Sequence, residues 1–282
     1  KQVHTFMRST FDTESIVTSK NTYVAPFVNA EEAQYLVIEN AFPNGRPALE
    51  NAGVMFTSRE TVEKVERMKV CTCLNPLHTA LAVYGCLLGY TKISDEMKDA
   101  DLVKLVEIIG YKEGLPVVTD PGILSPKKFI DEVLQIRVPN PFMPDTPQRI
   151  ACDTSQKLSI RFGETIKEYM ASSELDVKSL KFIPMVQAGW CRYLLGVDDE
   201  LNAFTVSPDP MYEELAGKLA GVKVGESCDV HAVLSPILSD AKIFGVNLYE
   251  AGLGEYVESI FAELIAGKGA VRETLKRHLA EA

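Results

Sequence analysis

Apolar residues recur at the spacing of one helix face from Ser58 to Tyr90, and this stretch carries the strongest structural signal in the chain. Val62, Val65 and Met68 follow one another on one side of the pattern, which predicts an amphipathic α-helix. Ser58 is a good N-cap, and the acidic residues that follow it suit the positive end of a helix dipole. We therefore expect one long helix here.

Pro76 falls inside this helical pattern. A proline has no N–H to donate to the carbonyl of Thr72, and its ring crowds the preceding turn. The sequence therefore predicts a kink between Thr72 and Asn75.

Other segments have the same periodicity, so the chain is predicted to be mainly α. The expected helices cover residues 30–40, 94–98, 101–109, 126–135, 147–152, 163–171, 177–195, 211–219, 231–239, 257–266 and 270–280. Short β-prone pieces occur at 15–18, 22–24 and 54–56. We interpret residues 1–29 as a linker or peripheral segment and residues 30–282 as one helical domain.

Composition and charge indicate a folded globular protein and argue against two other classes, nonspecific nucleic-acid binders and membrane-spanning proteins. With 46% hydrophobic and 24% charged residues, the 282-residue chain has the composition of a folded globular protein. A net charge of −10 argues against nonspecific nucleic-acid binding. No uninterrupted apolar run reaches the ~18 residues that a membrane span needs.

The chain lacks a dinucleotide-binding fingerprint. The best match runs from Gly252 to Val257, where valine replaces the third glycine, and too few residues follow it for a βαβ unit. We interpret this match as the start of a helix.

The six cysteines are scattered without a CxxC pair, which is typical of buried free thiols in a reducing cytoplasm. Cys71, Cys73 and His78 are of the residue types that bind zinc. We disfavour a zinc site because residues two apart on a helix point in different directions and no fourth ligand is evident. The expected metal content is none.

Three polar side chains occur close together in the predicted long helix. Lys69, Asn75 and His78 fall within ten residues of mostly apolar sequence. Two interpretations are open. In the structural one, Lys69 lies on a solvated face, Asn75 belongs to the proline kink and His78 is a core histidine. In the functional one, the three side chains form an acid/base site.

These residues resemble the Lys-x4-Asn-x2-His motif of the polyol-specific long-chain dehydrogenases, the mannitol dehydrogenase family. The resemblance extends to Phe42–Glu50 and to Pro139–Arg149, and it covers most of residues 30–200. Within that family the sequence looks closest to the D-mannonate oxidoreductase (fructuronate reductase) type.

The resemblance implies a fold and a partner domain. Family members have an N-terminal Rossmann domain that binds NAD or NADP and a helical C-terminal domain similar to that of 6-phosphogluconate dehydrogenase. The present chain, which begins at Lys1, looks like the C-terminal domain alone, so we expect the cofactor to be bound mainly by an absent domain. The implied ligand is a small sugar acid or polyol, and the implied location is the cytoplasm.

The resemblance also implies roles for individual residues. Lys69 would be the general acid/base, Asn75 a donor that polarises the carbonyl, and His78 a partner of the substrate oxygens. Arg149 and Lys157 would bind substrate, and for a hexonate they would hold its carboxylate.

Several other polar or aromatic residues attract attention but have equally good packing or surface roles, so we do not assign them to the site. They are Glu31, Arg46, Arg161, Trp190 and Arg192.

The spacing departs from the family motif by one residue, because five residues separate Lys69 from Asn75. On a regular helix, nine residues would place Lys69 about 180° from His78, against about 80° for the eight residues of the family. A π-bulge absorbs one extra residue, and Pro76 has already removed a hydrogen bond that such a bulge would break. We therefore predict a bulge or break between Lys69 and Asn75 that returns Lys69 to the face of His78.

Two alternatives to a sugar-acid dehydrogenase stay open. One is a mannitol-type polyol 2-dehydrogenase that acts on an uncharged sugar alcohol. The other is a non-enzymatic helical interaction module, in which the five candidate residues would not converge on one site.

Overall fold

The computed structural model describes residues 16–17, 23–24, 35–143 and 145–282, and it divides the chain into two compact units, Lys1–Leu36 and Val37–Ala282. In the first unit, strand β1 (Ile16–Val17) pairs antiparallel with strand β2 (Tyr23–Val24). Both strands were predicted from their β-prone sequence. Most of the expected segment 1–29 lies outside the described residues.

The second unit begins with two parallel strands, β3 (Val37–Glu39) and β4 (Met55–Thr57). The helix expected over residues 30–40 is therefore wrong in its described part. Val37 and Ile38 are β-branched, and pairing with β4 supplies backbone hydrogen bonds that continue to Asn40, whose N–H lies 2.8 Å from the carbonyl of Thr57. Local periodicity could not show this lateral partner.

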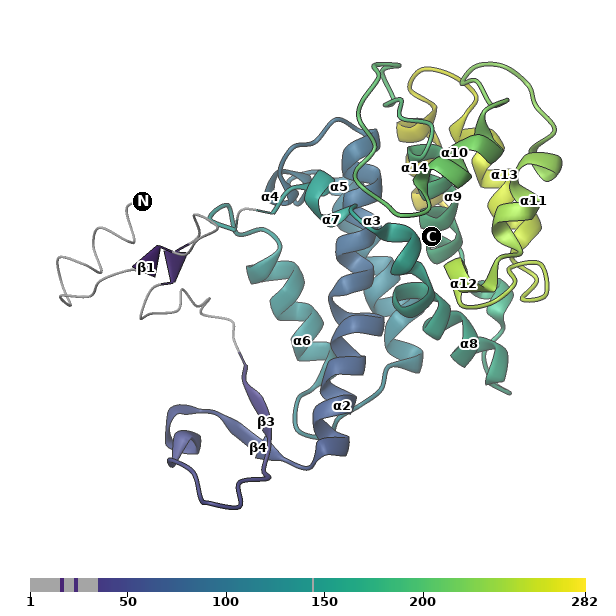
Figure 1. The fold of residues 1–282 in the computed structure, drawn as a ribbon. Coiled ribbons are helices and arrows are strands. Elements are labelled where there is room, and N and C mark those ends of the chain that lie inside the picture. Colours follow the sequence, from purple (N-terminus) through teal and green to yellow (C-terminus); the bar gives the residue numbers. More distant parts are fainter. Residues whose placement is uncertain (1–15, 18–22, 25–34, 144) are drawn as a thin grey trace. The chain divides into compact units, whose positions relative to one another are not determined.

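The rest of the second unit is helical, as Figure 1 shows. Its α-helices are α2 (Arg59–Met68), α3 (Asn75–Leu87), α4 (Ile93–Glu96), α5 (Ala100–Glu107), α6 (Pro126–Glu132), α7 (Pro147–Ile150), α8 (Glu164–Ala171), α9 (Phe182–Tyr193), α10 (Tyr212–Leu219), α11 (Val230–Leu238), α12 (Ala241–Phe244), α13 (Gly254–Leu264) and α14 (Ala270–Ala280). Short 3₁₀ turns are η1 (Leu49–Ala52), η4 (Leu115–Val117), η6 (Thr154–Gln156) and η8 (Val177–Ser179). The prediction of a mainly α chain is confirmed, and α13 begins at Gly254, inside the glycine-rich match.

Four stretches in the described part of the chain are π-helical: η2 (Lys69–Cys73), η3 (Ile108–Gly114), η5 (Val133–Arg137) and η7 (Ser159–Gly163). Each π-helix has looser turns than an α-helix and is rare outside functional or strained places. Two of them, η3 and η7, pack against η2. The bulge predicted between Lys69 and Asn75 is confirmed as η2.

Helix α3 is the centre of the fold. Every residue of α3 except Asn75 is buried, and α5, α7, α9, η3 and η7 pack around it. Figure 1 shows α2 and α3 running end to end through the second unit. A helix that is apolar on all sides is stable only inside such a shell.

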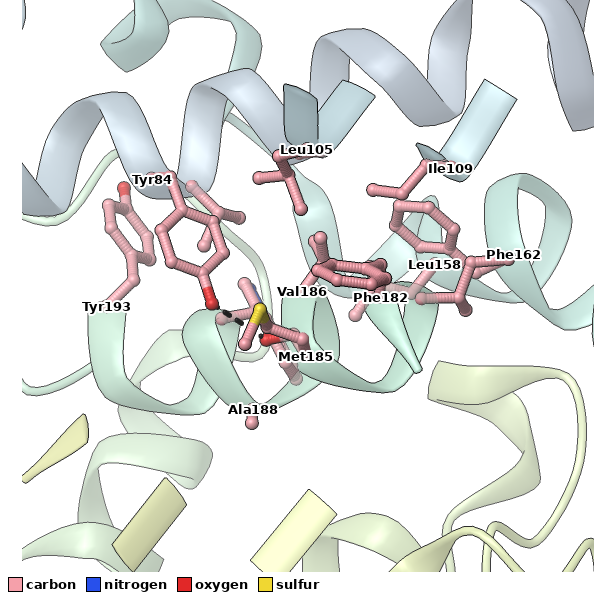
Figure 2. Close-up of a cluster of buried hydrophobic side chains, with 14 of the residues drawn as sticks. Tyr84, Leu105, Ile109, Leu158, Phe162, Phe182, Met185, Val186, Ala188 and Tyr193 are labelled. Carbon is pink, nitrogen blue, oxygen red and sulfur yellow. Dashed lines mark hydrogen bonds between the residues drawn. The ribbon is translucent and has the colours of Figure 1, made fainter. Parts of the chain in front are cut away.

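Helix α9 packs against α3, and all twelve of its own residues are buried. Figure 2 shows the cluster between α3 and α9, in which the hydroxyl of Tyr84 donates to the carbonyl of Met185 at 3.2 Å. Helix α13 covers the other side of α9. The core thus fixes α3 from several directions, which matters because α3 carries two candidate site residues.

A buried carboxylate joins η3 to the start of α9. Glu113 accepts hydrogen bonds from the backbone N–H groups of Lys181, Phe182 and Ile183 at 2.7–2.8 Å. These N–H groups have no partners within their own helix, so the carboxylate stabilises the helix end.

Gly85 makes room for a second buried carboxyl group. A Cβ atom added to Gly85 would lie 2.1 Å from Oε1 of Glu96, a residue of α4 with no exposed surface. Neither carboxyl oxygen of Glu96 has a hydrogen-bond partner among the described residues. Burial, followed by the charge of Asp99, raises the pKa of Glu96 to about 9.

The helical run Arg59–Leu87 is long and apolar enough to span a membrane by length and composition alone. However, 89% of its apolar window is buried within the fold. This run is the core helix already described.

Candidate active site

The π-helix η2 and a break at Leu74 separate Lys69 from the start of α3. The N–H of Leu74 donates to the carbonyl of Lys69 at 3.1 Å, and the backbone of Leu74 (φ −132°, ψ −61°) is not helical. The hydroxyl of Thr165 donates to the carbonyl of Cys71 at 3.4 Å, a partner for part of the loosened backbone. The predicted kink is therefore confirmed, and the extra residue before Asn75 is absorbed in η2.

Lys69 lies at the start of η2 with one third of its side chain exposed. Its Nζ atom lies 3.6 Å from Oε2 of Glu66, one turn earlier on α2. No hydrogen bond or ion pair among the described residues joins Lys69 to the other candidate side chains.

Asn75 and His78 occupy the first turn of α3, three residues apart and so on one face. Pro76 lies beside Asn75 in this turn, where its missing N–H costs nothing because a helix start has no acceptor for it. The hydroxyl of the buried Thr79 donates to the carbonyl of Asn75 at 2.9 Å. The turn that presents Asn75 and His78 is thus held by a side chain as well as by its backbone.

His78 is 9% exposed and lies in a positive electrostatic environment. Burial is the largest cause that lowers its pKa, to about 4, and the charges of Arg137, Arg161 and Arg149 lower it further. The imidazole is therefore neutral near pH 7. A neutral imidazole can donate one hydrogen bond and accept another, which suits the hydroxyl and carbonyl oxygens of a sugar.

Arg149 reaches this environment from α7, which packs against α3. Thr146 caps α7 by accepting the N–H of Arg149 at 3.2 Å, and Asp145 forms an ion pair with the Arg149 guanidinium. Because 60% of the Arg149 side chain is exposed, its donors can turn towards a bound anion.

Lys157 follows a tight turn that begins at Asp153, a residue in the left-handed conformation (φ 52°). Asp209 holds this turn by accepting the N–H of Ser155 at 2.8 Å and its hydroxyl at 2.5 Å. The Lys157 ammonium donates to the carbonyl of Cys152. Burial, then the charge of Arg161, lowers the pKa of Lys157.

The sequence analysis considered Arg161 but left it out of the site. This residue lies on η7, its N–H donates to the carbonyl of Lys157 at 2.9 Å, and its Nη1 donates to Oγ1 of Thr79 at 2.7 Å. Its charge acts on both His78 and Lys157. The sequence spacing could have pointed to this residue. Arg161 follows Lys157 by four positions, which places both cations on one side of a helical turn.

Asn75 and His78 thus share the first turn of α3, and the charges of Arg149 and Arg161 act on His78. The charge of Arg161 also acts on Lys157, whereas the contact of Lys69 is with Glu66. Neutral amide and imidazole groups lie among several cations. Such a set can bind an anion with several hydroxyl groups and stabilise negative charge on an oxygen.

Cys71 and Cys73, which lie on η2, are protonated thiols. Burial raises the pKa of Cys71 and raises that of Cys73 to about 12. All six cysteines are free, and Cys152 and Cys228 are only partly buried. Within the described residues, no group of three His, Cys, Asp or Glu side chains is arranged to hold a metal ion.

A family model described as the mannitol dehydrogenase C-terminal domain matches residues 61–261. The chain therefore belongs to the mannitol dehydrogenase family.

Individual relatives refine this assignment. D-mannonate oxidoreductase of Thermotoga maritima is 61% identical over 267 residues, which are 93% of this chain and 49% of that protein. Mannitol 2-dehydrogenase of Aspergillus niger is 31% identical over 241 residues, 83% of this chain and 47% of that protein. The sequence is thus of the D-mannonate oxidoreductase type. It spans about half the length of these curated relatives.

A solved structure has the same fold. Pseudomonas fluorescens mannitol 2-dehydrogenase, in a ternary complex with NAD and D-mannitol, superimposes with a TM-score of 0.73 at 24% identity. The match covers 96% of this chain and 54% of that chain.

Proposed function

We propose that this chain is the substrate-binding and catalytic domain of an NAD(P)-dependent dehydrogenase that interconverts a hexonate, such as D-mannonate, with its keto-sugar acid, fructuronate. The observation that carries the proposal is that the positive charges of three arginines, on η5, α7 and η7, all act on His78. A carboxylate suits such a cationic environment, because guanidinium groups bind it by paired hydrogen bonds. The 61% identity to a D-mannonate oxidoreductase supports the same substrate class.

In this proposal each candidate residue has one role. Lys69 accepts the hydroxyl proton when the alcohol is oxidised and returns it when the ketone is reduced. Asn75 donates to the carbonyl oxygen as negative charge develops there, and His78 orients the neighbouring hydroxyl groups. Arg149 and Lys157 hold the carboxylate.

The nicotinamide cofactor would accept or supply the hydride. The described residues have no glycine-rich strand–turn–helix that fits a dinucleotide, so we propose that an N-terminal Rossmann domain binds it. The described helices would then form a domain similar to the C-terminal domain of 6-phosphogluconate dehydrogenase, with residues 30–282 as its extent.

Strands β3 and β4 support a partner domain. Parallel strands occur mostly in sheets that are covered on both faces, whereas this pair stands alone in the second unit and has partly exposed residues. Phe42 and Leu49, in the connection between the strands, are also exposed. We propose that the pair extends the sheet of the N-terminal domain.

The second candidate is a mannitol-type polyol 2-dehydrogenase, which the 31% identity to mannitol 2-dehydrogenase favours. Both candidates are metal-independent enzymes, and the six free cysteines suit a cytoplasmic location.

The test uses the full-length gene product that contains this chain. Steady-state reduction of fructuronate, tagaturonate and fructose would be measured with NADH and with NADPH. The proposal expects a uronate to be reduced and the Lys69→Ala variant to lose several orders of magnitude in kcat while it stays folded. Preference for fructose would support the polyol alternative, and an active Lys69→Ala variant would remove Lys69 from the chemistry.

A further inference from the structure

Arg161 forms hydrogen bonds with two parts of the candidate site, the first turn of α3 and the turn that carries Lys157. Its guanidinium donates to Thr79 at 2.7 Å, and the Thr79 hydroxyl donates in turn to the carbonyl of Asn75 at 2.9 Å. The two residues Arg161 and Thr79 are 82 positions apart in the sequence, so this contact joins η7 directly to the first turn of α3. Thr79 is 1% exposed, which leaves its hydroxyl no solvent partner.

We propose that Arg161 is a positioning residue of the active site, which fixes the first turn of α3 through Thr79 and sets the electrostatic environment of His78. The proposal rests on the function proposed above. Arg161 does not need to touch the substrate in this role.

The hydrogen bonds explain how Arg161 would act on Asn75. The break at Leu74 leaves the start of α3 without the preceding helical turn that would otherwise hold it. The chain Arg161–Thr79–Asn75 replaces that support from a neighbouring element. A buried hydrogen bond to a charged donor is stronger than one between neutral groups, so this link resists displacement of Asn75.

Charge explains how Arg161 would act on His78. The charged groups that act on His78 from the elements around it are Arg137 on η5, Arg149 on α7 and Arg161 on η7. Burial lowers the pKa of Arg161 to about 10, and its guanidinium is held in place by the hydroxyl of Thr79. A fixed, poorly solvated cation acts more strongly on a neighbouring imidazole than an exposed one does.

The experiment compares five variants of the full-length protein. Arg161→Gln removes the charge, and Arg161→Lys keeps it. Thr79→Val removes the hydroxyl, and Thr79→Ser restores it. Arg277→Gln on α14, whose exposed guanidinium pairs with Glu263, removes one positive charge from a distant surface as the control.

Two measurements are made on each variant. Selective ¹³Cε1-histidine labelling follows the titration of His78 by NMR, with the signal assigned from a His78→Asn variant. The second measurement is the pH profile of kcat/KM for the sugar acid. Thermal unfolding confirms that each variant is folded.

The proposal expects Arg161→Gln to raise the pKa of His78 by about one unit, because the imidazole loses a nearby like charge. Arg161→Lys and Arg277→Gln should titrate like the natural protein. Thr79→Val should leave the titration unchanged but lower kcat/KM about tenfold or more, and Thr79→Ser should recover most of this loss.

An unchanged His78 titration in folded Arg161→Gln would overturn the electrostatic role. If that variant does not fold, the kcat/KM of Thr79→Val tests the positioning role. Full activity of Thr79→Val would overturn that role. If the natural protein reduces no sugar acid, the proposed function fails, but the His78 titration still tests Arg161.

Discussion

The N–H of Leu74 donates to the carbonyl of Lys69, five residues earlier, where a regular α-helix would join residues four apart. This hydrogen bond belongs to the π-helix that accommodates the extra residue before Asn75. The π-helix takes up one residue of the backbone, while the return of Lys69 to the face of His78 stays a prediction.

Deletion of Val70 should therefore be tolerated. The shortened chain can close η2 into a regular α-helix, because the deletion restores the family spacing of Lys-x4-Asn. We expect kcat/KM within about tenfold of the natural protein and an unchanged circular dichroism spectrum. As a matched control, deletion of Ala82 from the regular helix α3 rotates one half of a buried helix by about 100° and should prevent folding. Loss of folding on deletion of Val70 would mean that the bulge is structurally required.

His78 should weaken the fold in acid. Its pKa of about 4 in the folded state lies below the ordinary value of 6.5, so the unfolded chain binds more protons between these values. Stability is then fully present above pH 6.5 and is lost as the pH falls towards 4. Compared with His78→Asn, the natural protein should lose about 3 kcal/mol over this range. Urea unfolding at a series of pH values measures the difference, and parallel curves for the two proteins would contradict it.

Glu96 should weaken the fold as the pH rises from 4.5 to about 9. Its pKa is raised from 4.5 to about 9, so the folded state binds more protons than the unfolded chain between these values, and stability falls as the pH rises. Glu96→Gln has no proton to lose. Its stability advantage over the natural protein should grow by up to about 3 kcal/mol from pH 6 to pH 8. An advantage that does not change with pH would show that Glu96 is not protonated in the folded state.

Two glycines within helices should respond in opposite ways to alanine. Gly85→Ala places a methyl group into the Glu96 carboxyl and should destabilise the fold by about 1–3 kcal/mol. A Cβ atom at Gly217 on α10 meets nothing within 4 Å, so Gly217→Ala should stabilise by about 0.5–1 kcal/mol. Thermal unfolding compares the two, and a Gly85→Ala/Glu96→Ala double variant should recover part of the first loss. A neutral Gly85→Ala variant would show that α4 moves away freely.

Local rules predicted the features that have local causes. Pro76 and the extra residue before Asn75 were enough to predict the break and the bulge, because both act on the hydrogen bonds of their own helix. Helix α14 was predicted with its observed bounds, since glycine precedes it and cations end it. The placement of Lys69 in the chemistry stays a prediction.

Features with distant causes could not be predicted. Strand β3 depends on pairing with a strand sixteen or more residues away in sequence, and the helix expected there was wrong. Arg161 has a role only because Thr79 lies opposite it across the fold. Glu96 sits in the polar run Ser94-Asp95-Glu96, whose composition favours an exposed helix surface, and only the missing side chain of Gly85 allows its burial.

The contact of Glu113 with the start of α9 also bears on how the chain is made. Its three N–H partners are synthesised about seventy residues later, so the carboxylate has to remain hydrated while that part of the chain emerges. Removing this hydration before the partners arrive is unfavourable, which delays consolidation of η3 against the core. A nascent chain halted before Lys181 should therefore keep this region open to chaperones and proteases.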